Sequence, residues 1–242
     1  MTLLVGLKGT DGLVVASDSR GTFGDPRGVT AQNDAQKKLY VTSKYTAILT
    51  AGAGELGATV MAEVLMQVKG VEGVTPVMEL TRTHVVQRYR EWFPGFAIQQ
   101  IPGLVAPMRP DLALMIAGYD LDANGKPAEQ RIFQLLSQMD FAPMLHNYGF
   151  ALAGVAQYAL YLLNRLYQPG AGVEQLKALG AYVITETASQ DGKVGGPVQM
   201  ATIVPSDGCK ELTQEQVADV VDNNQRRSEG LKGSFFSLGG KQ

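Results

Sequence analysis

The feature that most constrains the fold of this chain is that its predicted helices come in consecutive pairs. Apolar residues recur at helical spacing over residues 55–69, and Pro76 is well placed to open a second helix that ends near Trp92. Two more helices are expected over 155–167 and 172–189. Parallel strands are joined by single crossover helices, so paired helices favour antiparallel sheets with helices layered outside them. We therefore expect an α+β fold rather than a doubly wound parallel sheet.

The strands are expected before and between the helix pairs. Runs rich in β-forming residues lie at 3–7, 13–19, 37–41, 45–50, 112–117, 131–136 and 198–204. Residues 21–34 and 93–110 are rich in turn-forming residues and are interpreted as loops, and a last helix is expected over 214–227. A chain of 242 residues is long enough for one compact domain, which we place at residues 1–229, followed by a tail over 230–242.

The composition excludes several classes of protein. A net charge of −2 gives no electrostatic reason to bind nucleic acid or an anionic membrane. Cys209 is the single cysteine and there are two histidines, so we expect no internal disulfide, no zinc and no cofactor. The longest apolar stretch, Phe150–Leu163, is shorter than the ~18 residues of a membrane span and is interpreted as a buried helix. We recognise no secretory signal and expect a cytoplasmic protein.

Residues 52–57 spell G-x-G-x-x-G between an expected strand and an expected helix. A dinucleotide-binding loop uses this pattern to present backbone N–H groups and a helix N-terminus to a pyrophosphate. The second parallel strand of such a unit is missing, because the stretch V-K-G-V-E-G-V-T-P that should contain it is broken by glycines. The remaining interpretations are a tight strand-to-helix turn or an N–H donor directed at a group other than phosphate.

Thr2 and Asp18 lie near the ends of the first expected hairpin. A three-residue loop at residues 10–12 would pair residue 2 with residue 20 and place Asp18 on the same sheet face as Thr2. A two-residue turn at Asp11-Gly12 would turn Asp18 to the other face. The pattern alone leaves both registers open.

The position of Thr2 has a chemical consequence. Aminopeptidases normally remove an initiator methionine that precedes a small residue, which would leave Thr2 with both a hydroxyl and a free α-amine. That amine has a pKa near ~8, so it can accept the hydroxyl proton and later return it. An activated hydroxyl also needs a nearby cation and an oriented carboxylate, which a lysine of the next hairpin and Asp18 can supply.

Three stretches of the sequence resemble the proteasome β subunits, which are N-terminal nucleophile hydrolases. They are T-L-L-V-G-L-K-G-T-D-G-L-V-V-A-S-D-S-R-G-T, K-K-L-Y and I-L-T-A-G-A-G-E, within about the first 60 residues. The resemblance implies a four-layer αββα sandwich of two antiparallel sheets flanked by helix pairs. It also implies that Thr2 is the nucleophile, that Asp18 and Lys38 assist it, and that the N–H of Gly52 forms the oxyanion hole.

The resemblance assigns further residues to the site. Gly21 and Thr22 would bind the main chain of an extended substrate, and Thr50 would form a wall of a roomy side-chain pocket. Asp191 corresponds to a later family aspartate. Two serines of the family are replaced, one by a valine in Gly154-Val155-Ala156 and the other by Val194 in D-G-K-V-G-G. These valines would make the surroundings of the α-amine drier and poorer in hydrogen bonds.

The expected function is a threonine-type endopeptidase that attacks peptide bonds of polypeptides through an acyl-enzyme after loss of Met1. The resemblance implies self-association into a homo-oligomeric ring. Two alternatives stay open at this point. One is a catalytically inactive ring-forming scaffold, which the two valines favour. The other is a non-degradative amide hydrolase or peptide ligase of the same superfamily.

Overall fold

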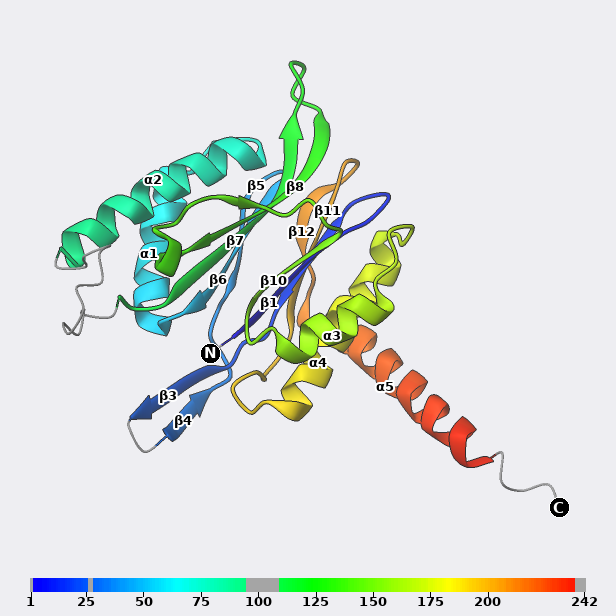
Figure 1. Ribbon diagram of the computed structural model, residues 1–242. Coiled ribbons are helices and arrows are strands. Elements are labelled where there is room, and N and C mark those ends of the chain that lie inside the picture. The colour runs from blue at the N-terminus through cyan, green and yellow to red at the C-terminus, as the bar shows by residue number, and fades with distance from the viewer. Residues whose placement is uncertain (1, 26–27, 95–108, 238–242) are drawn as a thin grey trace.

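Two antiparallel sheets, each of five strands, form the centre of the structure (Figure 1). The computed structural model describes residues 2–25, 28–94 and 109–237. Its elements are β1 Leu3–Lys8, β2 Leu13–Ser17, β3 Gly21–Asp25, β4 Gly28–Asn33, β5 Leu39–Ser43, β6 Thr46–Gly52, α1 Gly54–Gln67, α2 Val74–Trp92, β7 Leu112–Leu121, β8 Pro127–Leu136, the short 3₁₀ helix η1 Ser137–Met139, β9 Met144–Leu145, β10 Phe150–Gly154, α3 Gln157–Leu166, α4 Val173–Gln190, β11 Gln199–Val204, β12 Gly208–Glu211 and α5 Gln214–Ser237.

The two sheets are built from different parts of the chain. The first has the strand order β10-β1-β2-β11-β12 and the second has the order β5-β6-β7-β8-β9. All the described strand pairs are antiparallel. The hairpin β3–β4 forms a separate two-stranded sheet beside the N-terminal end of β1 (Figure 1). The α+β fold with antiparallel sheets is therefore confirmed.

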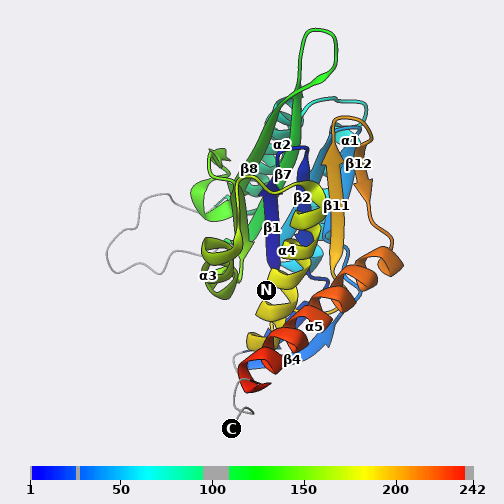
Figure 2. The same cartoon turned by 90° about the vertical axis from the view of Figure 1, so that its right-hand side faces the viewer.

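Alternation along the strands separates the core into three apolar clusters. Leu4 of β1 and Leu49 of β6 belong to the cluster between the two sheets. Leu3 of β1 points the other way, into a cluster shared with α3, α4 and α5. Ile48 of β6 belongs to a cluster shared with α1 and α2. Figure 2 shows α4 lying across β1, β2 and β11, with α5 outside it.

The second helix of the first pair is fixed at its start by a distant strand. Both the N–H and the hydroxyl of Thr75 donate to the carboxylate of Asp120 in β7, at 3.0 and 2.9 Å. This carboxylate satisfies an N–H at the open N-terminal end of α2, where Pro76 is tolerated because it needs no donor partner. α2 therefore begins two residues before the expected Pro76 and ends at the expected Trp92.

The structure corrects three expectations about local structure. The expected loop 21–34 contains the hairpin β3–β4. The stretch 150–163 begins as strand β10 and becomes helical only at Gln157, after a left-handed Gly154. Helix α5 continues past residue 227 to Ser237, because a helix that has already formed tolerates glycines at a cost of about 1 kcal/mol each. The domain boundary at residue 229, which α5 crosses, stays a prediction.

Most of the expected loop 93–110 lies outside the described residues. None of the described helices combines the length and the apolar character that a membrane crossing requires.

Candidate active site

Thr2 lies immediately before β1, at the N-terminal end of this inner strand of the first sheet, and its exposed fraction is 4%. Its carbonyl oxygen accepts a hydrogen bond of 2.8 Å from the N–H of Val155, just after β10. Gly154 is left-handed, with φ +84°, and any Cβ there would collide with the carbonyl oxygen of Thr2. The strand pair β1–β10 therefore fixes the backbone of Thr2, and only glycine fits opposite it.

The position of Asp18 follows from a register that differs from the three-residue-loop expectation. Leu4 pairs with Ser17 and Lys8 with Leu13, so residue 3, not residue 4, lies opposite residue 18. The N–H of Gly9 bonds to the carbonyl of Gly12 at 2.7 Å, which closes a two-residue turn. A two-residue turn places the Asp18 side chain on the sheet face opposite to that of Thr2, as the alternative register predicts. The turn residues are Thr10 and Asp11, one residue earlier than the Asp11-Gly12 turn considered above. The Asp18 side chain therefore contacts β1 through the backbone N–H of Leu3, the residue after Thr2.

The carboxylate of Asp18 is completely buried and accepts four hydrogen bonds. Oδ1 accepts from the N–H of Leu3 and from Lys38 Nζ, both at 3.0 Å. Oδ2 accepts from the N–H of Arg20 at 3.2 Å and from the N–H of Gly195 at 3.0 Å. A buried carboxylate is tolerated when donors surround it in this way, and its orientation is then fixed.

Lys38 supplies a buried cation beside this carboxylate. The residue directly precedes β5, is 2% exposed, and its ammonium donates to Asp18 Oδ1 and to the carbonyl of Arg20 at 2.6 Å. Burial lowers the pKa of Lys38 below its usual value of 10.5, and the neighbouring Asp18 carboxylate opposes that decrease. Lys38 lines a pocket together with Thr2, so its charge acts on the space in front of the threonine.

The glycine motif forms a turn from β6 into α1. Gly52 has φ +117°, and a Cβ there would collide with the carbonyl oxygen of Asp111 on the neighbouring chain segment. Its strand, β6, is antiparallel to both β5 and β7, so the parallel unit of a dinucleotide-binding fold is absent. The cap residue Ala53 makes no side-chain hydrogen bond, so the positive end of α1 has no side-chain cap. This end of the helix favours a developing negative charge near Gly52.

The predicted substrate-binding residues surround Thr2. A groove of about 500 Å³ is lined by Thr2, Gly21, Thr22 and Gly52. An inner pocket is lined by Thr2, Lys38, Thr50 and Gly52, and the role of Thr50 as a wall of a substrate pocket stays a prediction. The expectation of a roomy pocket is wrong, because its volume open to a water-sized sphere is about 10 Å³.

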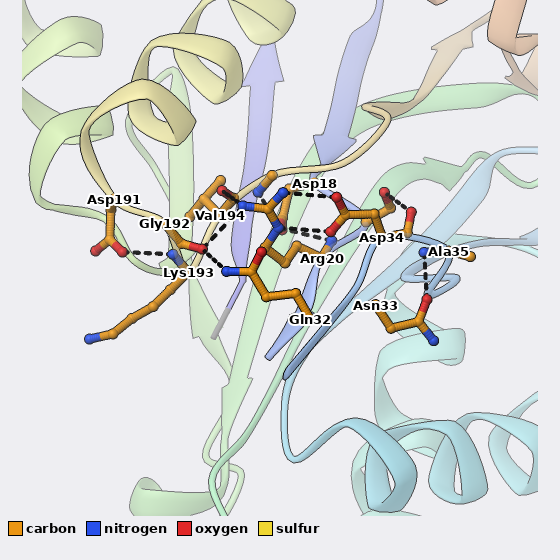
Figure 3. A network of polar contacts seen from close by, with 12 residues as sticks. Asp18, Arg20, Gln32, Asn33, Asp34, Ala35, Asp191, Gly192, Lys193 and Val194 are labelled. Carbon is orange, nitrogen blue, oxygen red and sulfur yellow. Dashed lines mark hydrogen bonds and ion pairs between the residues drawn. The ribbon is translucent and has the colours of Figure 1, made fainter. Parts of the chain in front are cut away.

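The structure places Asp191 at the edge of this arrangement (Figure 3). Its Oδ1 accepts a hydrogen bond of 2.9 Å from the N–H of Lys193, and its carbonyl accepts one of 3.0 Å from the N–H of Val194. These bonds close the turn that brings the N–H of Gly195 to Asp18. Among the described contacts, the Asp191 carboxylate has none with Thr2, Asp18 or Lys38. Its catalytic role stays a prediction.

The two valines form an apolar side of the site. Val194 is fully buried in the cluster between the first sheet and its helices, and Val155 packs against the same cluster. Leu3, directly after Thr2, belongs to this cluster too. Val155 contributes its backbone N–H to Thr2, but neither valine offers a side-chain hydrogen bond.

An outer network around Arg20 was not predicted from the sequence (Figure 3). The guanidinium binds both oxygens of Asp34, at 2.7 and 2.8 Å, and donates to the carbonyl of Gly192 at 3.2 Å. Gln32 of β4 donates to the same carbonyl at 3.1 Å. Arg20 thus links the β3–β4 hairpin to the 191–195 turn. Its place in D-S-R, two residues after Asp18, was a usable signal, whereas nothing in the sequence marked Asp34.

Comparison with curated proteins gives proteasome β subunits. The subunit of Mycobacterium sp. (strain KMS) is 28% identical over 239 residues, which cover 93% of this chain and 73% of the relative. The subunit of Mycolicibacterium gilvum is 27% identical over 229 residues, which cover 90% of this chain and 70% of the relative. No family model matches the chain.

Comparison with solved structures gives Anbu, described as an ancestral β subunit. Anbu from Yersinia bercovieri superposes with a TM-score of 0.72 at 15% identity, covering 99% of this chain and 98% of that one. A helical assembly of Anbu from Pseudomonas aeruginosa gives 0.69 at 19% identity, covering 97% and 96%. The chain therefore has the fold of these proteins and is similar to proteasome β subunits. Together the comparisons support a proteasome-like N-terminal nucleophile hydrolase.

Proposed function

We propose that this protein is a threonine-type endopeptidase whose nucleophile is Thr2 after removal of Met1. The observation that carries the proposal is the buried ion pair of Asp18 and Lys38. The same Asp18 oxygen that binds Lys38 also accepts a hydrogen bond from the N–H of Leu3, the residue after Thr2. A buried ion pair is seldom a net source of stability, because desolvation of both charges offsets their attraction. A role in activating the adjacent hydroxyl accounts for its position.

The proposed reaction uses Thr2 as both nucleophile and base. The hydroxyl proton passes to the α-amine while Thr2 Oγ bonds to the carbonyl carbon of a peptide bond. Lys38 stabilises the developing alkoxide, Asp18 holds Lys38, and the N–H of Gly52 donates to the oxyanion. The carbon–nitrogen bond then breaks, and the leaving amine takes the proton from the α-amine.

The acyl-enzyme is hydrolysed by the same groups. A water molecule gives one proton to the α-amine and adds its oxygen to the ester carbonyl carbon. The bond between that carbon and Oγ then breaks, and Oγ recovers the proton. No cofactor is needed for this sequence. Among the described residues, no group of three or more His, Cys, Asp or Glu side chains is arranged to hold a metal ion.

The arrangement of the sheets and helices and the comparison with relatives also support the proposed endopeptidase. The three apolar clusters agree with a four-layer αββα sandwich, in which helix pairs cover the outer faces of both sheets. The Pseudomonas aeruginosa relative is described as a helical assembly, and we propose that this chain also self-associates. Its substrates would be polypeptides bound as an extended strand in the groove beside Gly21 and Thr22.

One rival function is favoured by a specific observation. Val194 is buried in an apolar cluster against which Val155 packs, so neither position offers a side-chain hydroxyl, as expected of a ring-forming scaffold that has lost activity. The intact set of Thr2, Asp18, Lys38 and Gly52 argues against that loss.

Incubation of the wild-type protein and Thr2→Ala with an unfolded polypeptide, followed by mass spectrometry of the products, tests the proposal. We expect new termini with the wild-type protein alone. A second incubation with an excess of a free amine separates hydrolysis from ligation, because a ligase would give amide products in place of acids. A wild-type chain that has lost Met1 and yields neither product would establish the inactive scaffold.

A further inference from the structure

The side-chain amide of Gln36 lies across the opening of the inner pocket. Its Oε1 is 2.9 Å from where a Cβ on Gly21 of β3 would lie, and its Nε2 is 2.6 Å from where a Cβ on Gly54 of α1 would lie. The amide therefore fills the space between the hairpin and the first turn of the helix. Gln36 lines both the inner pocket and the groove of about 500 Å³, so it lies at their common boundary.

The inner pocket combines small walls with two polar groups. Gly54, Gly57 and Ala58 contribute no side chain larger than a methyl group. Thr50 is 7% exposed, and its hydroxyl lies 3.3 Å from where a Cβ on Gly57 would lie. Within the described part of the chain, neither this hydroxyl nor the Gln36 amide has a hydrogen-bond partner. Gln36 is partly exposed, and the Thr50 hydroxyl is not among the fully buried side-chain atoms without a partner, so both groups keep hydrogen-bonding capacity that a bound ligand can use.

The backbone of Gln36 is held firmly while its amide is not. Its N–H donates to the carbonyl of Ser19 at 3.1 Å, and its carbonyl accepts from Gln199 Nε2 at 2.7 Å. The side chain therefore projects from a fixed point. Rotation about its own bonds is the motion that enlarges the pocket.

We infer that Gln36 determines specificity, because its amide limits the inner pocket to a small side chain such as that of alanine or serine. This inference rests on the proposed function and names the substrate class of that site. The side chain concerned belongs to the residue whose carbonyl Thr2 attacks, since the pocket is lined by Thr2, Gly52 and Thr50 together. Serine or alanine at this position fits, with serine able to bond to the Thr50 hydroxyl and the Gln36 amide. Leucine and phenylalanine require the amide to move.

The test compares rates of covalent modification by four tripeptide epoxyketones, which carry alanine, serine, leucine or phenylalanine next to the reactive ketone. Intact mass spectrometry follows the adduct on the wild-type protein, on Gln36→Ala and on Gln67→Ala. Gln67 is the exposed last residue of α1, about 20 Å along the helix from Gly54. It therefore reports the effect of the same substitution away from the pocket.

We expect the wild-type protein and Gln67→Ala to react roughly 10–200-fold faster with the serine and alanine probes than with leucine or phenylalanine. Gln36→Ala should reduce that preference at least about tenfold, by accelerating the reaction with the large probes. Equal wild-type rates with all four probes, or an unchanged preference in Gln36→Ala, would overturn the inference while leaving the endopeptidase proposal intact. No adduct with any probe on a processed wild-type chain would remove both proposals.

Discussion

The two sides of Thr2 differ in a way that defines the site. On one side, the Asp18 carboxylate accepts four hydrogen bonds and holds a buried Lys38 ammonium. On the other side, Val155 and Val194 present only apolar side chains, although the backbone N–H of Val155 holds the carbonyl of Thr2. One side therefore consists of charged side chains, and the other of a backbone N–H and apolar side chains.

This difference separates two functions of the surroundings. In the proposed mechanism, the charged side acts on the hydroxyl, because a cation near Oγ stabilises an alkoxide. The apolar side adjoins the backbone of Thr2 through the N–H of Val155, and in the proposed mechanism a free α-amine of Thr2 exchanges protons after removal of Met1. A dry environment disfavours the protonated amine, so we expect proton transfer to limit the proposed reaction.

The largest effect is expected from Lys38→Met. Loss of the cation removes alkoxide stabilisation, so the rate of adduct formation should fall by at least about 100-fold. It also leaves Asp18 buried without its counter-charge, which should lower the free energy of unfolding by about 3–5 kcal/mol. Modification kinetics and urea denaturation measure the two effects.

Lys8→Met is the matched control, because Lys8 is partly buried at the far end of β1 and donates to the carbonyl of His146 at 2.9 Å. It should cost about 1 kcal/mol of stability and leave the rate unchanged. Equal rates in Lys38→Met and the wild-type protein would show that the charged side has no part in the chemistry.

The second largest effect is expected when the apolar side of Thr2 is also given polar side chains. Val155→Ser combined with Val194→Ser adds hydroxyls near the α-amine and should raise the modification rate about tenfold, by assisting proton transfer. Burial of the hydroxyl at residue 194 should cost about 1–3 kcal/mol of stability. The double alanine variant is the control, since it removes the same methyl groups without adding a donor. If the serine and alanine variants are equally fast, dryness does not limit the reaction.

The third effect is a bell-shaped dependence of the modification rate on pH. The α-amine must be neutral to accept the hydroxyl proton, so the rate should rise through the pKa of this amine, which dry surroundings would lower from its ordinary value of ~8. Lys38 must be protonated, and burial lowers its pKa below the ordinary lysine value of 10.5. As the pH rises further, the rate should therefore decrease again before pH 10.5 is reached. Circular dichroism at each pH confirms that the protein stays folded. A rate that keeps rising through pH 10.5 would contradict the role of Lys38.

The smallest effect is expected from Asp34→Asn. The side chains of Arg20 and Asp34 are 21% and 42% exposed, so their ion pair should contribute less than about 1 kcal/mol. The hydrogen bond from Arg20 lowers the pKa of the Asp34 carboxyl, so this contribution is present near neutral pH and is lost as pH falls through that pKa. Urea denaturation at neutral and acidic pH measures it. A rate that falls more than tenfold would place this outer network in the chemistry.

The sequence predicted the elements with clear periodicity and failed where distant contacts decide. The helical pattern after Gly52 and the Pro76 signal gave α1 and α2 to within a few residues. The hairpin β3–β4 was missed, because its glycines resemble a loop and long-range bonds such as that from Gln32 to Gly192 hold it. The register of β1 and β2 was also undecided, since one residue in the turn changes which face each side chain occupies.

The candidate site was predicted in its parts but not in its connections. The motifs located Thr2, Asp18, Lys38 and Gly52, whereas the contact from Gly195 to Asp18 joins residues far apart in the chain. The size of the inner pocket could not be read from Thr50 alone, because the amide of Gln36 fills its opening.

The central claim is that Thr2 is the activated nucleophile, and the most direct measurement is the intact mass after incubation with a threonine-directed epoxyketone. Wild-type protein, Thr2→Ser and Thr2→Ala should be compared, because serine keeps the hydroxyl and the α-amine while alanine keeps only the amine. The account predicts loss of Met1 and one adduct on the wild-type and Thr2→Ser proteins, with none on Thr2→Ala. A processed wild-type chain without an adduct, or an adduct that persists in Thr2→Ala, would contradict it.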